Sequence, residues 1–341
     1  MKIFLTGHTG FKGSWFTMLM QSQGHEVFGY SLDPLEGGLF QSANLKDKIA
    51  SDVRGNILDS SFLQRAIKNA KPDVVVHMAA QPLVRSSYVY PEETFQVNVT
   101  GTLNLLSVCR DVPSIRALAI ITTDKVYKNT GEKKPYVESD ALGSSDPYST
   151  SKAMADLLTQ SWAKNSSMVP VAILRAGNVI GGGDVSQDRL IPDLVRAKKS
   201  GQSPSLRNPS AVRPWQHVLD CLAGYQKTIE WLLSYEENLI LNIGPMAYDY
   251  RNVGEVAEMF IRLSNGKNWV QTLEESPPEA DFLTLDSSKA RSILGWKEAY
   301  DFKKAIEVTY EWFDAQSQGR DMYEVSLKQI EEFQSAQRCD V

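Results

Sequence analysis

Only three of the 341 residues are cysteine and only four are histidine, so the chain has few of the usual metal ligands or disulfide partners. Cys109, Cys221 and Cys339 show neither metal-site nor disulfide spacing, and the histidines are scattered along the chain. We therefore expect no metal site. Unpaired cysteines are typical of a reducing compartment, and we predict a cytoplasmic protein.

Long apolar runs and a strong charge imbalance are also missing. The largely apolar segment at residues 1–5 is interrupted by glycine, histidine and lysine too soon for a signal peptide or a membrane span. A net charge of −5 gives no general attraction to nucleic acid or to an anionic membrane. The 42% hydrophobic and 23% charged residues are typical of a globular protein with a sizeable core.

A glycine-rich turn follows the first predicted strand, residues 2–6, and precedes a helix predicted to run through Met20. The first glycine permits a tight turn, the second lets the backbone approach a pyrophosphate, and the third lets helix and strand pack closely. The helix amino terminus offers free N–H groups to the phosphates. We predict a dinucleotide-binding loop formed by Gly7, Thr9, Gly10, Phe11, Lys12 and Gly13.

The second predicted strand, residues 26–31, is expected to end at the adenosine ribose. The position that usually has an acid for the ribose, two residues after Gly29, is Ser31, and the nearest acid is Asp33. No arginine stands there to bind a 2′-phosphate. On this basis we favour NAD over NADP.

The segment with the most candidate catalytic residues runs from residue 122 to residue 152. Thr123, Asp124 and Lys125 follow an apolar strand, residues 117–121, at the carboxyl end where open α/β sheets bind ligands. Tyr148 and Lys152 are four residues apart, so one face of a predicted helix presents both. We expect the ammonium to lower the pKa of the phenol and make it a base near neutral pH. A second Tyr-x-x-x-Lys, Tyr300 with Lys304, is interpreted as an ordinary helix pair.

Together these motifs resemble the extended, nucleotide-sugar-modifying branch of the short-chain dehydrogenase/reductase superfamily. The resemblance implies an α/β fold, a Rossmann-like doubly wound parallel sheet with a smaller carboxyl-terminal substrate-binding region, and NAD as cofactor. It implies Thr123, Tyr148 and Lys152 as catalytic residues. It adds to the cofactor site a segment at Asn56 and Ile57, the strand end at Ala79 and Ala80, and Asn98, whose amide we expect to brace the neighbouring loop.

The pattern changes near residue 177 to glycine-rich and proline-punctuated sequence. We therefore assign residues 1–176 to the NAD-binding domain and 177–341 mainly to substrate binding, with segments near 215–245 returning to the first domain. Arginines suit the pyrophosphate of a nucleotide sugar. The predicted substrate residues are Asn178, Arg189, Leu190, Arg207, Arg213 and His217.

Further motifs at 7–15, 123–127, 175–184, 188–193 and 213–218 resemble those of the nucleotide-sugar 4,6-dehydratases. Lys125 matches the group that acts on CDP-glucose, whereas glutamate is usual there in enzymes for dTDP-glucose or GDP-mannose. The resemblance implies that Asp124 is the acid and Lys125 the base of water elimination, which requires a protonated carboxyl and a neutral amine. As adjacent residues they could equally form a salt bridge.

Three alternatives remain open at this point: another nucleotide-sugar dehydratase or a 4-epimerase, a net dehydrogenase that releases NADH, and a non-catalytic NAD-binding regulator. The resemblance also implies a homodimer through helices near residues 95–110 and 148–164. Residues 320–338 are predicted to form a polar helix.

Overall fold

A parallel sheet of seven strands forms the centre of the computed structural model, which describes residues 1–165, 169–272 and 280–339. Its strand order is β3-β2-β1-β4-β5-β6-β11, and every neighbouring pair is parallel. The predicted doubly wound, Rossmann-like sheet is confirmed. The strands are β1 (Lys2–Thr6), β2 (Glu26–Ser31), β3 (Ser51–Arg54), β4 (Val74–His77), β5 (Ala117–Thr123), β6 (Val171–Ala176) and β11 (Leu239–Ile243).

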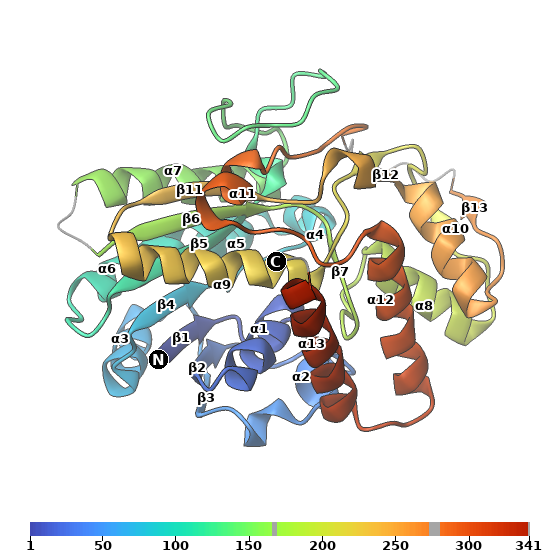
Figure 1. Ribbon diagram of the computed structural model, residues 1–341. Helices are drawn as coiled ribbons and strands as arrows, with labels where there is room; N and C mark the ends of the chain where they lie inside the picture. The colour runs from blue at the N-terminus through green and yellow to red at the C-terminus, as the bar shows by residue number, and fades with distance from the viewer. Residues whose placement is uncertain (166–168, 273–279, 340–341) are drawn as a thin grey trace.

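Helices cover both faces of this sheet, so its central strands are apolar in nearly every position. Ile3 and Leu5 pack with one set of helices, while Phe4, between them in sequence, packs with the other set. Figure 1 shows α9 lying along the sheet. The first set includes α1 (Phe11–Ser22) and α9 (Val218–Tyr235); the second includes α3 (Ser60–Ala70), α6 (Gly101–Arg110) and α7 (Pro147–Asn165).

After β6 the chain builds a second group of elements beside the carboxyl ends of the strands, on the right in Figure 1. The chain then returns to the main sheet as β11, which pairs with β6, before it adds further elements to the second group. This group contains β7 (Val179–Ile180), α8 (Leu190–Ser200), β8 (Ser205–Leu206), β9 (Val212–Arg213), β10 (Gln216–His217), β12 (Arg251–Asn252), α10 (Val253–Ser264), β13 (Val270–Gln271) and α12 (Phe302–Ser317).

The remaining helices are short connections or lie on the outside. The predicted carboxyl-terminal helix is present as α13, which packs against α1, α2 and α12. Among the described helices, we find none with an apolar stretch suited to crossing a membrane. The helices of this remaining set are α2 (Leu39–Ser42), η1 (Leu45–Asp47), α4 (Val84–Val89), α5 (Pro91–Phe95), η2 (Gln96–Thr100), η3 (Asp124–Val126), η4 (Ala247–Asp249), α11 (Ser288–Leu294) and α13 (Met322–Cys339).

A glycine run after β7 joins the two parts of the molecule. A Cβ atom on Gly182 would lie 1.9 Å from Cγ of Trp312, so only glycine allows α12 to approach this closely. The Trp15 indole N–H donates to the Gly182 carbonyl at 2.8 Å, which ties the same turn to α1. This contact fixes the start of the loop that leads to Asp184 and Arg189.

Candidate active site

A cavity of about 620 Å³ lies at the carboxyl ends of the strands, between the sheet and the second group of elements. It extends from Ser31 and Asn56, at the β2 and β3 ends, to Arg213 on β9. Such strand ends are the usual ligand site of open α/β sheets. The predicted residues that line it are Gly7, Thr9, Gly10, Phe11, Lys12, Gly13, Asn56, Ile57, Ala79, Ala80, Thr123, Asp124, Lys125, Tyr148, Lys152, Asn178, Arg189, Leu190, Arg207 and Arg213.

The glycine loop has the close packing that a pyrophosphate site requires. Gly7 has a φ of +80°, and a Cβ there would meet the Ala79 nitrogen at 2.8 Å. A Cβ on Gly13 would lie 2.1 Å from the Gly7 carbonyl oxygen. The N-cap of α1 is Gly10, which offers no side-chain cap, and the first turn has no acid, so the helix amino terminus can bind an anion. The loop therefore fits a dinucleotide pyrophosphate.

At the ribose end an arginine from β3, Arg54, approaches the turn after β2, but it does not line the cavity. The hydroxyls of Ser31 and Thr9 are hydrogen-bonded to each other at 2.8 Å between their oxygens. Arg54 pairs with Ser31 in the register of β2 and β3, donates to the Leu32 carbonyl at 3.1 Å, and lies 3.8 Å from Asp33. Adjacent parallel strands bring these residues together across a long stretch of sequence, which local reading cannot show.

Arg54 is itself held in place by a buried group of side chains. Asp52 accepts from Arg54 Nη2 at 2.7 Å and is hydrogen-bonded to His8 Nε2 at 2.8 Å. The Arg54 guanidinium also lies over the Phe40 ring, 4.9 Å from its centroid. Burial lowers the pKa of His8, so its ring is neutral near neutral pH. The β3 end therefore supports the turn that follows β2.

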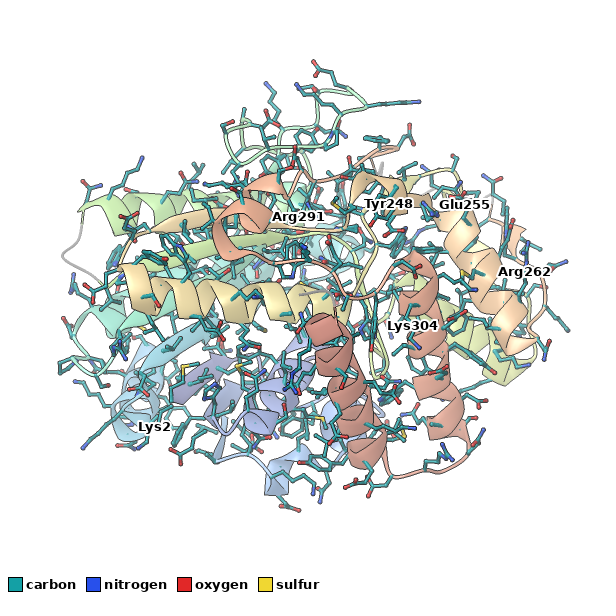
Figure 2. The ribbon with its side chains drawn as sticks, in the orientation of Figure 1. Lys2, Tyr248, Glu255, Arg262, Arg291 and Lys304 are labelled. Atoms are coloured by element: carbon teal, nitrogen blue, oxygen red, sulfur yellow. The ribbon has the colours of Figure 1, made fainter. Side chains whose placement is uncertain are left out.

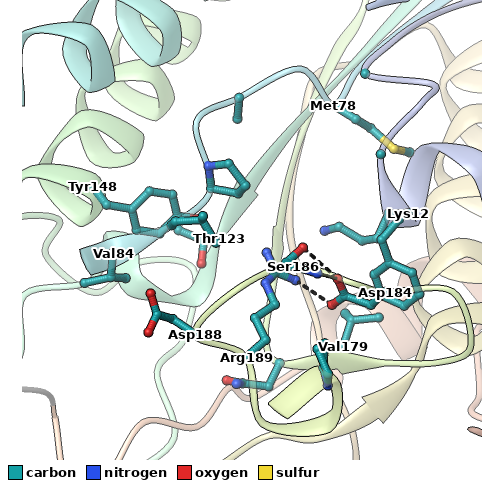
Figure 3. A pocket seen from close by; sticks show the side chains of 18 of the residues that line it. Lys12, Met78, Val84, Thr123, Tyr148, Val179, Asp184, Ser186, Asp188 and Arg189 are labelled. Carbon is teal, nitrogen blue, oxygen red and sulfur yellow. Dashed lines mark hydrogen bonds and ion pairs between the residues drawn. The ribbon is translucent and has the colours of Figure 1, made fainter. Parts of the chain in front are cut away.

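The five predicted catalytic residues lie on one wall of the cavity. β5 ends at Thr123 and continues into the short helix η3, while α7 presents Tyr148 and Lys152 from the adjoining side. Tyr148 and Thr123 both line the cavity, and Figure 3 shows the two side by side, with Lys12 on the opposite wall. Thr123 Oγ1 also donates to Asp124 Oδ1 at 2.9 Å. The tertiary structure thus joins two segments that the sequence separates by a polar loop.

The predicted lowering of the Tyr148 pKa is not found. Burial raises the pKa of Tyr148 to about 12, and it outweighs the opposing effects of Arg189 and the Thr123 hydroxyl. Lys152 Nζ donates to the Ile121 carbonyl at 2.9 Å. Burial, aided by the charge of Lys12, lowers the pKa of Lys152 itself to about 7. Spacing on a helix predicted the pair correctly, but desolvation changes the pKa of both groups more than their attraction does.

Asp124 has the protonation preference that an acid requires. Its side chain is buried, and its Oδ2 has no hydrogen-bond partner. Burial raises the pKa of Asp124, against the lowering effects of Lys125 and Thr123. Among the ion pairs of the described residues, none joins Asp124 to Lys125 within 4.0 Å. Burial thus favours the protonated form of a carboxyl beside the cavity, which is the form that a proton donor needs.

At the other end of the cavity, arginines are paired with two carboxylates from the loop that precedes α8. Asp184 lies 3.4 Å from Arg189, and Asp188 accepts from Arg85 at 2.9 Å and Arg207 at 3.3 Å. Arg213 is buried on β9 and lines the same space. Sequence reasoning missed Arg85 and Asp188. Arg85 closely follows the β4 strand end, and that position was the available signal.

Comparison with known proteins agrees with this geometry. A family model described as GDP-mannose 4,6 dehydratase matches residues 4–309. The chain belongs to this dehydratase family. Its relatives include a CDP-glucose 4,6-dehydratase from Salmonella typhimurium, 39% identical over 98% of this chain and 96% of the relative. A dTDP-glucose 4,6-dehydratase from Xanthomonas campestris is 28% identical over 91% of this chain and 92% of the relative.

Solved structures of similar fold include a nucleotide-sugar dehydratase and an epimerase. A dTDP-glucose 4,6-dehydratase from Bacillus anthracis in complex with NAD superposes with a TM-score of 0.79 at 25% identity, covering 95% of this chain and 99% of that chain. A UDP-glucose 4-epimerase from Stenotrophomonas maltophila gives a TM-score of 0.83 at 21% identity, covering 94% and 99%. The latter likeness concerns the fold alone.

Two predicted site residues of this dehydratase lie outside the cavity. His217 is fully buried; its Nδ1 accepts from the Leu219 N–H at the start of α9, and its ring contacts Trp15 and Tyr300. Its assignment to substrate binding was wrong because the chain turns between Arg213 and His217 and places the imidazole in the core. Asn98 does brace the loop, since its amide bonds to both backbone groups of Gln81, but it does not line the cavity.

The second Tyr-x-x-x-Lys copy lies apart from the catalytic wall of the dehydratase fold. Lys304 is on α12, where Figure 2 labels it, and its ammonium lies 6.0 Å from the Tyr300 ring centroid. Neither residue lines the cavity. The prediction of a helix pair was wrong, because Asp301 caps α12 and Tyr300 therefore precedes the helix that carries Lys304.

Proposed function

We propose that this protein is an NAD-dependent lyase that converts CDP-D-glucose to CDP-4-dehydro-6-deoxy-D-glucose. The observation behind the proposal is the single wall of the cavity that Thr123 and Tyr148 share with buried Asp124 and half-buried Lys125. Thr123, Tyr148 and Lys152 suit oxidation of a sugar hydroxyl, while elimination of water needs an added acid and base. The 39% identity to a CDP-glucose 4,6-dehydratase supports this substrate.

In the first step Tyr148 accepts the proton of the sugar C4 hydroxyl, and Thr123 holds that oxygen by a hydrogen bond. Burial opposes a phenolate, since the pKa of Tyr148 is about 12 in this structure. Tyr148 must therefore lose its own proton before it can accept this one. The charge of Arg189 and the Thr123 hydroxyl both favour that ionisation against the effect of burial.

In the second step the new 4-ketone acidifies the C5 proton. Lys125 removes this proton, and Asp124 protonates the C6 hydroxyl, which leaves as water. The raised pKa of Asp124 favours the protonated carboxyl that this role needs. Protonation at C5 and arrival of a hydride at C6 complete the 4-keto-6-deoxy sugar.

NAD, when bound, accepts the hydride from C4 and supplies it to C6. The residues that would hold it are the glycine loop with its helix amino terminus, Asn56, Ile57, Ala79 and Ala80, and Lys152 at the nicotinamide ribose. The tight packing of Gly7 on Ala79 supports this assignment. Because the hydride is taken and returned in one turnover, no NADH should be released.

The substrate's diphosphate is assigned to Arg213 and Arg207, with Arg189 nearby and Asn178 and Leu190 as further contacts. Arginine binds phosphate oxygens through two parallel hydrogen bonds, which suits a diphosphate. We place the change from the cofactor region to the substrate region near residue 177, just after β6 ends.

The deciding experiment is incubation of purified protein with NAD and CDP-glucose in deuterated water. We expect a product lighter by one water, with deuterium at C5 and no net NADH. Conversion of dTDP-glucose or GDP-mannose instead would refute the nucleotide assignment and keep the mechanism. A C4-inverted sugar of unchanged mass would indicate an epimerase. Turnover of no nucleotide sugar, with NAD bound, would favour the regulatory protein.

We also propose a homodimer and a cytoplasmic location. Leu103 on α6 and Met154 and Leu157 on α7 expose 37%, 45% and 53% of their surface, which is unusual for large apolar side chains on two packed helices. Pairing these helices with those of a second copy would cover them. The free thiols of Cys109 and Cys221 fit a reducing compartment.

A further inference from the structure

A buried arginine, Arg175, lies behind the catalytic wall and does not line the cavity. Its Nε and Nη2 donate to the two carboxylate oxygens of Asp156 at 2.8 and 2.9 Å. Its Nη1 donates to the Tyr127 hydroxyl at 3.0 Å and to the Glu138 carbonyl at 3.1 Å. Both charged side chains of the pair are at most 1% exposed. Desolvating two charges costs several kcal/mol per ion, so the burial of this ion pair needs an explanation.

On one side, Arg175 holds the catalytic helix. Tyr148, Lys152 and Asp156 are spaced four residues apart on α7, so they share one face. Asp156 also accepts from Thr122 at 3.3 Å, and Thr122 pairs with Arg175 in the register of β5 and β6. The ion pair therefore fixes α7 against the strand that ends in Thr123.

On the other side, Arg175 holds the segment that follows the acid and the base. Tyr127 comes two residues after Lys125, directly after η3, and its ring stacks on Tyr136 at 4.9 Å. Its hydroxyl donates to Asn242 Oδ1 at 2.6 Å and accepts from Arg175. Asn242 in turn donates to the Tyr136 and Asp286 carbonyls.

We propose that Arg175, acting through Asp156 and Tyr127, is a positioning residue that aligns Asp124 and Lys125 with Tyr148 and Lys152. Oxidation at C4 and elimination across C5 and C6 then occur without movement of the sugar. A planar guanidinium with donors in fixed directions sets such an arrangement more sharply than apolar packing could. This inference rests on the proposed dehydratase activity.

The test compares three variants during turnover of CDP-glucose with bound NAD. Tyr127→Phe keeps the ring and removes only the hydroxyl between Arg175 and Asn242. We expect turnover to fall roughly tenfold, because a misplacement of well under 1 Å in the acid–base pair slows elimination. The absorbance of reduced cofactor during turnover should rise, since oxidation continues. Its melting temperature and its affinity for NAD, measured by calorimetry, should stay near the wild-type values.

Tyr136→Phe is the matched control, because it removes a hydroxyl from the stacked ring that has no bond to Arg175. It should change neither turnover nor the absorbance. Asp156→Asn should slow turnover without the rise in absorbance, because it loosens α7. Since that variant also loses stability, Tyr127→Phe is the deciding one.

The inference is overturned if Tyr127→Phe turns over as fast as wild type, or if it is slower but shows no rise in the absorbance of reduced cofactor. It is also overturned if Tyr136→Phe changes turnover and absorbance to the same extent. A wild-type protein that dehydrates no nucleotide sugar would overturn the proposed function and this inference together. An active wild type with unaffected variants would overturn the inference alone.

Discussion

The buried ion pair of Asp156 and Arg175 leads to a quantitative prediction about stability. Asp156→Leu leaves a guanidinium in the core without its carboxylate, which costs about 3–5 kcal/mol. The entropy of unfolding near 60 °C is about 2.1 cal/mol/K per residue, which gives roughly 0.7 kcal/mol/K for a chain of this size. We therefore expect the melting temperature to fall by about 4–7 °C, as measured by calorimetry or circular dichroism.

Adding Arg175→Met to Asp156→Leu removes the unpaired charge and should restore at least half of the lost stability, because apolar groups of similar volume often replace a buried pair without loss. The control is Glu307→Gln, which breaks a surface pair with Lys303, 3.8 Å apart. It should cost less than about 0.5 kcal/mol. If Asp156→Leu also cost under about 1 kcal/mol, or the double variant were no more stable than the single one, the reasoning would be refuted.

Three further predictions address the site and the assembly. Arg213→Leu should raise KM for the nucleotide sugar by about 10-fold to 100-fold, because one charged hydrogen bond is lost. In the same steady-state assay His217→Asn should change KM less than about twofold. Equal effects of the two variants would mean that His217 does contact the substrate. Burial lowers the pKa of Lys152 to about 7 from 10.5. Above the unfolded pKa the amine is neutral in both states and does not reduce the free energy of unfolding. As the pH falls toward the folded pKa, the unfolded state binds a proton that the folded state does not, and the free energy of unfolding decreases. Denaturant unfolding from pH 7 to 10 should show the stability advantage of Lys152→Met over wild type shrinking by about 1.4 kcal/mol per pH unit, and a constant difference would contradict the burial argument. Leu157→Glu should convert a dimer to a monomer in analytical ultracentrifugation; a wild-type monomer would instead exclude the proposed interface.

Local chemistry made much of this protein predictable from its sequence. Apolar runs in β1, β4 and β5 arise from burial on both faces of a parallel sheet, and they can be read along the chain. The glycine loop is equally local, because Gly7 needs its φ of +80° whatever surrounds it. The spacing of Tyr148 and Lys152 follows from helix geometry alone. These features were sufficient to predict the fold and to name residues that line one cavity.

Other properties were decided by the tertiary structure. Arg54 reaches the turn after Ser31 because two strands are neighbours in the sheet, and His217 leaves the site because the chain turns into the core. The pKa of Tyr148 depends on how much water the surrounding elements exclude, which outweighs the charges nearby. Spacing within one element is set by backbone geometry, whereas desolvation and contacts between strands depend on what packs around each residue.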